Sequence, residues 1–458
     1  MIKQLLSTVA ACSAVAIGGS SFAAVSTDEA AKLKTTLTPL GAEKSGNKEG
    51  TIPEWTGGYK ATGPKYKSGP RPDPFPGEKP VLSITAKNMD QYADKLSEGT
   101  KALLKKYPDT YRLDVYPTHR TASAPQWVYD NTFKNATRAK TTHEGNSVEG
   151  AYGGIPFPIP KTGNEVMWNH QLAWQGEGYE WALRSWTVTS SGQLILSTAA
   201  DEWHQYPYYY KDGSAEKIGG GDFWYGTQTA SAPPFRAGEL TLVRDPLDMG
   251  GRGRQAWQYL PGQRRVRKAP SINYDNPDTI TSSGVSNMDE SFMFMGPQDR
   301  YTWKLVGKKE MYIPYNNNRL GSAKIADVIG PKHVNPDLKR WELHRVWIVE
   351  ANLAPGKRHV VPKKRYYFDE DSWFAVLGEG YDAQGALWKA QYSTMLLIPE
   401  LPGIIGSVNW GLYNLLTGAY LYDASLNELP YQLRVLEGSQ LKPESFFTPD
   451  GLVERGVR

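Results

Sequence analysis

The chain has 458 residues, with 52 lysines and arginines against 48 aspartates and glutamates, for a net charge of +4. This balance gives no support to nucleic-acid binding. Its 15 tryptophans and 27 tyrosines suit amphipathic clefts, sheet faces and interfaces, although a β-rich protein with an ordinary core would also contain many of them.

The first 23 residues have the organisation of a secretory signal peptide. One lysine precedes an apolar run from Leu5 to Gly18, and small residues lead up to Ala24. We expect cleavage after Ala23, so that the protein leaves the cytoplasm. Cys12 also fits a lipoprotein signal, but the sequence before it is too short for a charged region and an apolar core, and lipidation is not expected. Since Cys12 is the single cysteine, the mature chain then has no disulfide.

Residues 24–85 are predicted to form an extended arm rich in glycine and proline. The run YKATGPKYKSGPRPDPFPGEKP contains six prolines. Such a run cannot continue a helix or occupy a central strand, so it is either laid over the body or a loose linker. The body is then residues 86–458, a length compatible with one large domain or two intimate ones.

The arm contains the stretch LGAEKSGNKEGTIPEWTGG, whose middle resembles a calcium loop. Placing Gly50 at the sixth loop position puts Ser45 at the first and Thr56 at the twelfth, where strong carboxylate ligands are needed. We interpret the stretch as a turn that leads into a docked segment from Ile52 to Trp55.

Helical spacing of apolar residues predicts one amphipathic helix over Met89–Tyr107 and a second short helix over Gly163–Trp174. Strand patterns separated by short turns dominate the rest of the chain. The strands are predicted at Tyr179–Thr189, Gln193–Trp203, Glu239–Arg244, Gln255–Leu260, Arg264–Ala269, Tyr301–Pro314, Trp341–Leu353, His359–Asp369, Ser372–Leu377, Leu387–Met395, Trp410–Leu416 and Ala419–Leu426.

This succession predicts a mainly β fold of the β-rich α+β class, with one large, strongly curved antiparallel sheet or incomplete barrel covered by a few helices. The most apolar later stretch is Met395–Tyr422, but prolines, glycines and Glu400 interrupt it. We therefore predict no membrane-spanning helix. Residues 395–408 are expected to be buried or to cover the sheet.

Motifs for catalysis or metal binding are lacking. The seven histidines form neither H-x-x-x-H nor H-E-x-x-H, and no G-x-S-x-G or Walker A sequence occurs. We predict no enzyme activity, no catalytic residue, no metal and no cofactor. Asp201-Glu202 and Asp369-Glu370-Asp371 leave sugar chemistry open as an alternative. Adjacent strand residues point to opposite faces, however, so charged hairpin ends are the simpler interpretation.

The run GQRRVRKAP at residues 262–270 is the most basic motif. In a strand, Arg265 and Arg267 share one face, and their guanidinium groups suit a phosphate headgroup or an acidic partner surface. The alternative is that these charges protect a sheet edge from aggregation.

Several long motifs occur in order: LTPLGAEKSGNKEGTIPEWTGG, AWQYLPGQRRVRKAP, NYDNPDT, KLVGKKEMYIPYN, YYFDEDSW and YDAQG. Together they resemble a Gram-negative periplasmic family of unknown function that is labelled outer-membrane lipoprotein-sorting protein and is grouped with the LolA and LolB lipoprotein carriers. The resemblance implies a periplasmic protein with a curved antiparallel sheet, closed by helices over an apolar cavity for acyl chains. It also implies partnership with a resistance-nodulation-division exporter and an outer-membrane protein, and it supplies no catalytic residues.

The sequence thus favours a periplasmic carrier or adaptor for a hydrophobic molecule, a lipid or a lipoprotein acyl chain. The alternatives are an assembly or docking subunit that binds no ligand, and a secreted carbohydrate-active or carbohydrate-binding protein. Arg265 and Arg267 are the expected headgroup or partner contacts. The expected cavity wall consists of Trp174, Trp181, Trp186, Trp257, Tyr259, Trp347, Phe374 and Leu377, with Leu396, Leu397, Ile404 and Ile405 on a cover.

Overall fold

The computed structural model describes residues 24–60, 69–406, 408–429 and 433–456. The expected signal peptide and Cys12 therefore lie outside the described residues, as does part of the proline-rich run of the arm.

Most strands belong to one sheet of 16 strands. Its order is β1-β2-β12-β13-β14-β15-β18-β19-β5-β6-β7-β8-β9-β10, with β11 paired to β12 and β20 paired to β5. Neighbours in the described chain run antiparallel, apart from a two-residue parallel contact between β2 and β12.

The first half of the sheet consists of β1 (Leu82–Ile84), β2 (Leu113–Val115), β11 (Tyr301–Pro314), β12 (Arg340–Leu353), β13 (Lys363–Asp369), β14 (Ala375–Tyr381) and β15 (Leu387–Ser393). The second half consists of β18 (Trp410–Asn414), β19 (Tyr420–Ser425), β20 (Leu433–Leu436), β5 (Gly178–Val188), β6 (Leu194–Gln205), β7 (Asp222–Ala232), β8 (Leu240–Pro246), β9 (Gln255–Leu260) and β10 (Arg265–Lys268). Two small hairpins stand apart: β3 (Lys140–Thr142) with β4 (Ser147–Glu149), and β16 (Leu396–Ile398) with β17 (Gly403–Ile405).

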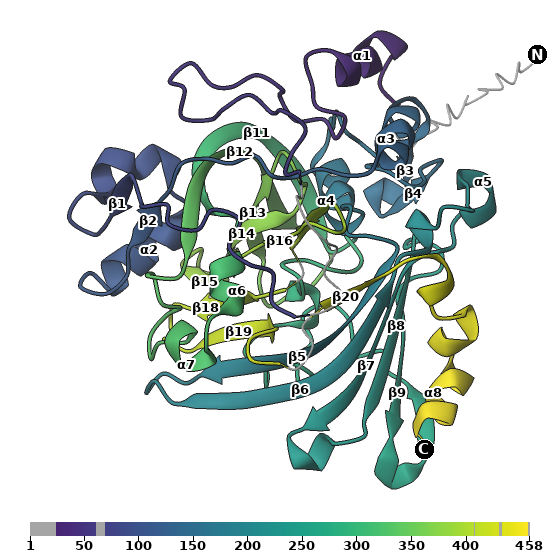
Figure 1. The fold of residues 1–458 in the computed structure, drawn as a ribbon. Helices are drawn as coiled ribbons and strands as arrows, with labels where there is room; N and C mark the ends of the chain where they lie inside the picture. Colours follow the sequence, from purple (N-terminus) through teal and green to yellow (C-terminus); the bar gives the residue numbers. More distant parts are fainter. Residues whose placement is uncertain (1–23, 61–68, 407, 430–432, 457–458) are drawn as a thin grey trace, which may run out of the picture.

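The large sheet bends strongly around the interior. In Figure 1, β11 and β12 arch over one side, while β5 to β9 sweep beneath the other. Register shifts in the β5–β6, β6–β7 and β5–β19 pairs accompany the bend, as expected because bulges increase local twist. The predicted fold class, a mainly β protein with one large curved antiparallel sheet and few helices, is confirmed.

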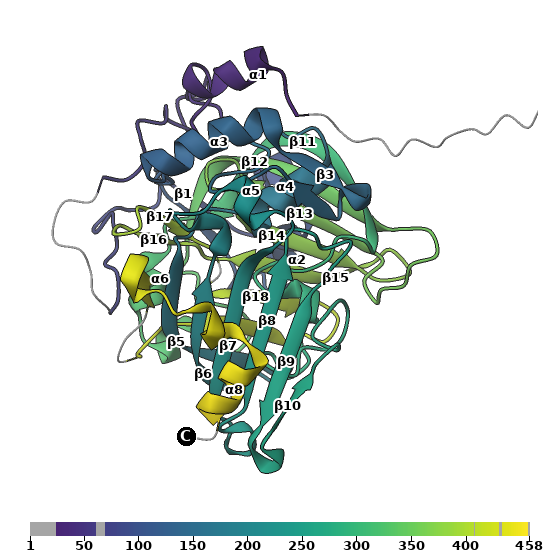
Figure 2. The ribbon, with the colours of Figure 1, turned by 90° about the vertical axis from the view of Figure 1, so that its right-hand side faces the viewer.

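The helices are short and lie around the sheet. They are α1 (Thr27–Ala31), α2 (Glu98–Lys106), α3 (Gln126–Arg138), α4 (Gly163–Gln171), α5 (Ala215–Ile218), α6 (Asn318–Ser322), α7 (Ile325–Val328) and α8 (Pro449–Gly456). Helix α2 packs on β14 and β15, and α4 packs on β11 and β12. Helix α8 lies on the outer face of β8, β9 and β10, where Figure 2 shows it in front of the strands.

The predicted helix Met89–Tyr107 is wrong as a single element. A 3₁₀ helix covers Met89–Lys95, and α2 begins only at Glu98. Leu96 between them is extended, and the Ser97 hydroxyl accepts a hydrogen bond from the Thr100 amide at 3.1 Å. A helix cap therefore divides the apolar pattern.

The second predicted helix is present as α4, three residues shorter than expected at its end. Thr162 and Glu165 form a reciprocal capping box at its start. The stretch 395–422 forms the β16–β17 hairpin and strands β18 and β19. None of the helices in the described ranges combines the length and the apolar character that crossing a membrane requires.

The described part of the arm lies against the body. Asn47 closes a turn, since its side-chain oxygen accepts a hydrogen bond from the Ile52 amide at 2.9 Å and its amide donates to the Thr51 hydroxyl at 2.8 Å. Ile52 is buried, and the Trp55 indole donates to the carbonyl of Ala122 at 3.0 Å. The stretch is therefore a turn that leads into a docked segment.

Candidate functional site

A hollow lies between the concave face of β5 to β8 and a long coil that crosses it. Side chains alternate along each strand, so Leu183 on β5, Glu202 on β6 and Val243 on β8 point to the same face. Trp224 on β7 and Trp410 on β18 complete the apolar part of the wall.

The coil comprises residues 269–300 and is called the cover segment. Ile272, Met288, Phe292 and Met295 reach the hollow from it. The Phe292 ring meets three rings of the sheet edge to face, with centroid distances of 5.6 Å to His204, 6.4 Å to Trp224 and 6.2 Å to Trp410. Phe292 therefore occupies the middle of the concave face.

Buried polar contacts hold the cover segment in place at two points along it. At one point, Lys364 binds Asp289 at 2.8 Å and Lys389 binds Glu290 at 2.7 Å. At the other point, Arg236 donates to the carbonyl of Thr279 at 3.3 Å. These attachments fix the backbone, while the apolar side chains face the hollow.

The hollow is small in this conformation. It consists of two adjoining chambers of about 90 and 100 Å³ that share Trp224, Val243 and Phe292 in their walls. Pockets that enclose small ligands measure about 300–1,000 Å³. The chambers therefore have room for a short apolar group or a few waters, and a whole acyl chain requires displacement of the apolar side chains of the cover segment.

One polar corner of the hollow is fully paired. The Trp224 indole donates to Nδ1 of His204 at 3.3 Å, so Nε2 of His204 carries the hydrogen that faces Glu202 at 3.1 Å. The Trp181 indole also donates to Glu202 at 3.1 Å. Glu202 is thus used as an acceptor for its neighbours and is not a free carboxylate.

A second polar corner is less well satisfied. Oδ1 of Asp423 accepts hydrogen bonds from Ser185 and from the amide of Ala424, but its Oδ2 and the Trp410 indole nitrogen are buried without a hydrogen-bond partner among the described residues. Burial raises the pKa of Asp423 to about 7, and the nearby charge of Asp278 acts in the same direction. This corner can accommodate a small polar group of a ligand.

None of the twelve residues predicted for the wall lines this hollow. Trp181 comes nearest, since it shares the concave face and binds Glu202. Trp257 and Tyr259 lie on the opposite face, in the apolar cluster beneath α8. Trp186, Trp347 and Leu377 lie on β5, β12 and β14.

The remaining predicted wall residues gather around the β16–β17 hairpin. The four cover residues Leu396, Leu397, Ile404 and Ile405 form its two strands and are buried. The Trp174 indole donates to the carbonyl of Pro402 in its turn at 3.3 Å, and Phe374 lies against Gly406. These six residues are part of the main buried core, and their contact with a ligand stays a prediction.

Arg265 and Arg267 lie on β10, the last strand of the sheet, and both are exposed. They pair in register with Leu260 and Gln258 of β9. Their guanidinium groups are thus accessible at a sheet edge, a position compatible with either interpretation of the basic motif.

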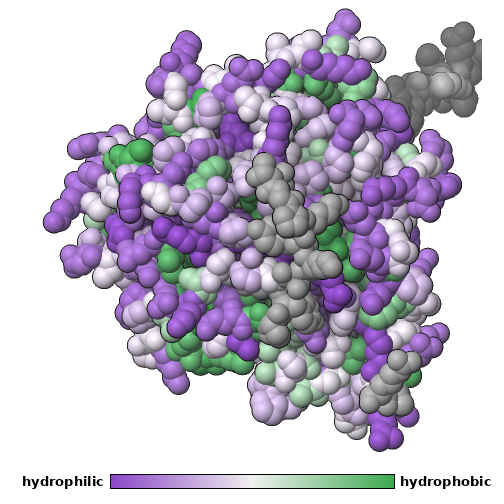
Figure 3. All heavy atoms as spheres, in the orientation of Figure 1, coloured by the Kyte–Doolittle hydropathy of each residue, from purple (hydrophilic) through white to green (hydrophobic). Residues whose placement is uncertain are grey.

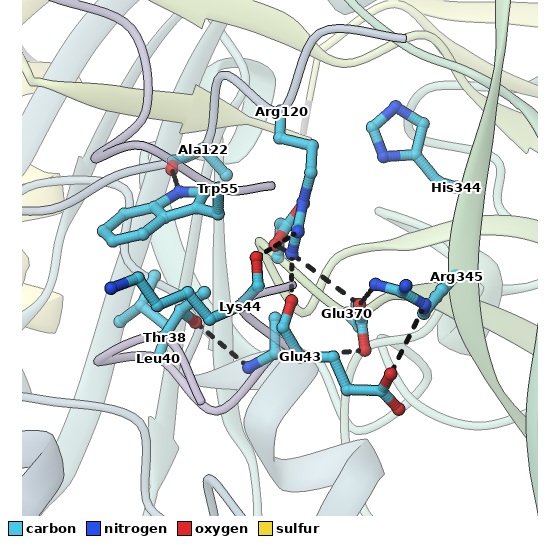
Figure 4. A network of polar contacts seen from close by, with 12 residues as sticks. Thr38, Leu40, Glu43, Lys44, Trp55, Arg120, Ala122, His344, Arg345 and Glu370 are labelled. Carbon is cyan, nitrogen blue, oxygen red and sulfur yellow. Dashed lines mark hydrogen bonds and ion pairs between the residues drawn. The ribbon is translucent and has the colours of Figure 1, made fainter. Parts of the chain in front are cut away.

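The acidic motif at residues 369–371 lies in a buried network between the arm and the sheet, which we call the Arg120 network (Figure 4). Arg120 binds both oxygens of Asp371, at 2.8 and 2.6 Å, and donates to the carbonyl of Glu43 at 2.7 Å. Glu370 faces Arg345 at 3.4 Å. Burial raises the pKa of Glu370 to about 7, Asp371 adds to this effect, and the nearby cations oppose it. The other members are Lys308 and the side chain of Glu43.

The wall residues on β5, β6 and β8 were not predicted from the sequence. The alternation of side chains between the two faces of these strands is the pattern that could have identified them. The predicted residues Trp257 and Tyr259 lie instead on the face beneath α8, because that face is also covered and apolar. The stretch MDESFMFM at 288–295 was the signal for the cover segment, since methionines and phenylalanines in a coil are typical of an adaptable apolar contact.

Comparison with known proteins gives a family match over most of the chain. The family model described as "Protein of unknown function (DUF1329)" matches residues 83–453. The uncharacterized protein PA3922 of Pseudomonas aeruginosa is 41% identical over 443 residues, which cover 95% of each chain.

Three solved structures are similar at low identity. A domain from Vibrio parahaemolyticus, provisionally named for outer membrane lipoprotein sorting, is 15% identical with a TM-score of 0.41 and covers 63% of this chain and 97% of its own. A DUF1329 family protein from Desulfovibrio piger is 14% identical with a TM-score of 0.40, covering 63% and 96%. The LolA superfamily protein NE2245 from Nitrosomonas europaea is 10% identical with a TM-score of 0.35, covering 64% and 100%.

Proposed function

We propose that this protein, which belongs to the DUF1329 family of proteins of unknown function, carries a hydrophobic molecule, a lipid or an acyl chain in the hollow between its concave sheet and the cover segment. The single observation that carries the proposal is this covered apolar hollow, walled by Leu183, Val243, Phe292 and two tryptophans. A periplasmic location and delivery to an exporter or an outer-membrane protein belong to the same proposal, and they rest on the amino-terminal sequence and the motif resemblance.

The energetics favour exchange of one apolar occupant for another. An acyl chain gains about 0.8 kcal/mol for each methylene group that it removes from water. Phe292, Met288 and Met295 of the cover segment line the hollow and contact its wall. When these side chains move out of the hollow, they expose apolar surface that the ligand then covers. The free energy gained by binding the ligand therefore offsets the free energy needed to open the hollow.

The exposed surface gives less support to the docking alternative. Large apolar side chains that are well exposed are scattered along the described chain, the most exposed being Phe235 at 84%, Val81 at 70% and Leu416 at 62%. On the face in Figure 3, hydrophobic residues form small groups among hydrophilic ones. A docking subunit would instead expose a contiguous apolar patch of several hundred Å².

The carbohydrate-active alternative requires an open polar cleft with two carboxylates. Asp369, Glu370 and Asp371 are each at most 3% exposed. They are enclosed by Arg120 and the arm, and a sugar has no access to them in this conformation.

Binding of N-phenyl-1-naphthylamine, with palmitate as competitor, tests the carrier proposal. We expect saturable binding by the wild type and at least tenfold weaker binding by Val243→Trp, because the indole occupies one chamber. Val81→Trp is the matched control, since Val81 is 70% exposed and directly precedes β1, at one end of the sheet order, and it should bind as the wild type does.

Val243→Phe gives a smaller increase in volume if the tryptophan variant does not fold. Native mass spectrometry with lipid extraction of the protein isolated from cells provides a second readout, and a stoichiometric lipid supports the proposal. Absence of both a co-purified lipid and saturable probe binding in the wild type would overturn it.

A further inference from the structure

His344, Asp369 and Asp371 come together in the interior next to the Arg120 network. His344 lies on β12 and is 1% exposed, Asp369 ends β13 and is 0% exposed, and Asp371 follows in the turn at 3%. One ligand atom from each lies within 4.8 Å of the others. Figure 4 shows His344 beside Arg345 and Glu370.

The orientation of His344 is fixed from behind. Its Nε2 faces Oε2 of Glu342 at 3.0 Å. Glu342 is itself held by Asn316 at 3.0 Å and by the amide of His119 at 2.8 Å. The hydrogen bond to Glu342 places a hydrogen on Nε2, so Nδ1 is the nitrogen that faces Asp369. Burial lowers the pKa of His344, but the contacts with Glu342, Asp369 and Asp371 outweigh it and raise the pKa, so an ion at Nδ1 would replace a proton. A carboxylate behind the imidazole is the usual second partner of a metal-binding histidine.

The atoms in front of His344 lack partners. Its Nδ1 lies 3.7 Å from Oδ1 of Asp369, which is too long for a hydrogen bond. Oδ1 of Asp369 is buried without any hydrogen-bond partner in the described chain, whereas Oδ2 accepts from the amide and hydroxyl of Ser372 at 2.9 and 2.6 Å. Burial and the charge of Asp371 raise the pKa of Asp369, while His344 and the hydrogen bonds from Ser372 act in the opposite direction.

A second unpartnered group lies at the same place. The Tyr315 ring stacks on His344 with centroids 4.0 Å apart. Its hydroxyl is fully buried and also has no hydrogen-bond partner among the described residues. Burial, followed by the charges of Asp369 and Asp371, raises the pKa of this hydroxyl well above the ordinary value.

The geometry points to a binding site for a divalent transition-metal ion, such as Zn²⁺, held by Nδ1 of His344 and the carboxylates of Asp369 and Asp371, with the Tyr315 hydroxyl beside it. An ion placed about 2.1 Å from both Nδ1 and Oδ1 of Asp369 would make an Nδ1–ion–Oδ1 angle of about 124°, which suits tetrahedral or five-coordinate zinc. A water at about 2.8 Å from both atoms would subtend only about 83°, which is narrow for hydrogen bonding. One imidazole and two carboxylates form a mixed ligand set that suits such ions.

Arg120 is compatible with this site. It binds both oxygens of Asp371 and thereby orients the carboxylate, whose oxygens retain further lone pairs. The same arginine donates to the carbonyls of Glu43, Lys44 and Pro53. A bound ion would therefore join β12 and the turn after β13 to the amino-terminal arm.

Metal binding by the full-length mature chain tests the site. After treatment with a chelator and dialysis, we expect titration calorimetry to find one tightly bound Zn²⁺ per chain, and anomalous scattering at the zinc edge to place it next to His344. Asp369→Asn should weaken binding by at least about 100-fold. This variant keeps the size of the side chain and an oxygen for the Ser372 contacts, so it should fold.

Tyr315→Phe is the second variant. It removes a hydroxyl that has no hydrogen-bond partner and should preserve the fold, and we expect about tenfold weaker Zn²⁺ binding. His359→Gln is the matched control, because His359 is another buried histidine paired with an aspartate, Asp289, at 2.9 Å. It should bind Zn²⁺ as the wild type does. Unchanged affinity in both Asp369→Asn and Tyr315→Phe, or an anomalous peak only at surface histidines, would overturn the assignment.

Discussion

The two halves of the large sheet enclose interiors of opposite character. Beneath β5 to β8, the interior is apolar and incompletely filled, and the cover segment occupies it with Phe292 and methionines. Beside β11 to β14, the interior is closely packed and includes the paired charges of the Arg120 network. Apolar contacts can be exchanged for those of a ligand at little cost, whereas a buried charge cannot leave its partner. The comparison therefore assigns exchangeable apolar side chains to the half that contains β5 to β8 and a fixed polar interior to the half that contains β11 to β14, while the backbone of the cover segment stays tied through Asp289 and Glu290.

Removal of Arg120 should have the largest effect. Arg120→Ala leaves Asp371 buried without its cation and releases the arm, so we expect the free energy of unfolding to fall by about 3–5 kcal/mol. Urea denaturation at pH 7 measures this loss. Arg265→Ala removes an exposed arginine and should change the free energy by less than about 0.5 kcal/mol. Equal losses in the two variants would contradict the rigid role of the Arg120 network.

The next largest effect is expected at the hollow. Phe292→Ala should lower the free energy of unfolding by about 2–3 kcal/mol, because it removes an aromatic group from between His204, Trp224 and Trp410. The same change should tighten binding of N-phenyl-1-naphthylamine about tenfold, since less apolar contact must be broken to open the cover segment. Phe235→Ala, at an 84% exposed phenylalanine, is the control for both measurements.

A loss of stability without tighter probe binding would remove the contrast between the two halves. It would mean that Phe292 is a fixed core residue and that the cover segment does not open.

The sequence predicts a strand well where a turn or a change in the apolar pattern marks both of its ends. The range Tyr301–Pro314 agrees residue for residue with β11. Strand β7 was missed because its inward positions include Gly226 and Gln228, so the apolar alternation along it is weak. That weakness has a cause, since these residues face the hollow and not a close-packed core.

The candidate sites were less predictable. Periodicity shows that Trp257 and Ala256 face opposite sides of β9, but it does not show which side is concave. The cover segment has no period at all. The proposed metal site joins three segments that are more than 20 positions apart, and only the fold brings Tyr315, His344 and Asp369 together.

Asp423 offers the smallest and most specific test, since it places one titratable group in the apolar half. Its pKa of about 7 in the folded protein lies above the ordinary value of 3.8. Folding therefore favours the protonated form, and the resulting stability is complete below about pH 4 and is lost as the pH rises through 7. Asp423→Asn does not titrate, so it should be about 1–2 kcal/mol more stable than the wild type at pH 8 and nearly equal to it at pH 4.

Paired urea denaturation curves at these two pH values measure the difference. If the difference in stability between Asp423→Asn and the wild type does not grow with pH, water or a counter-ion reaches the Asp423 carboxylate. The hollow would then be a wet cavity and not an apolar one. Because an acyl chain would then have to displace water that is bound to a carboxylate, it would gain less free energy on entering the hollow, and that result would weaken the physical basis for carriage in this half of the sheet.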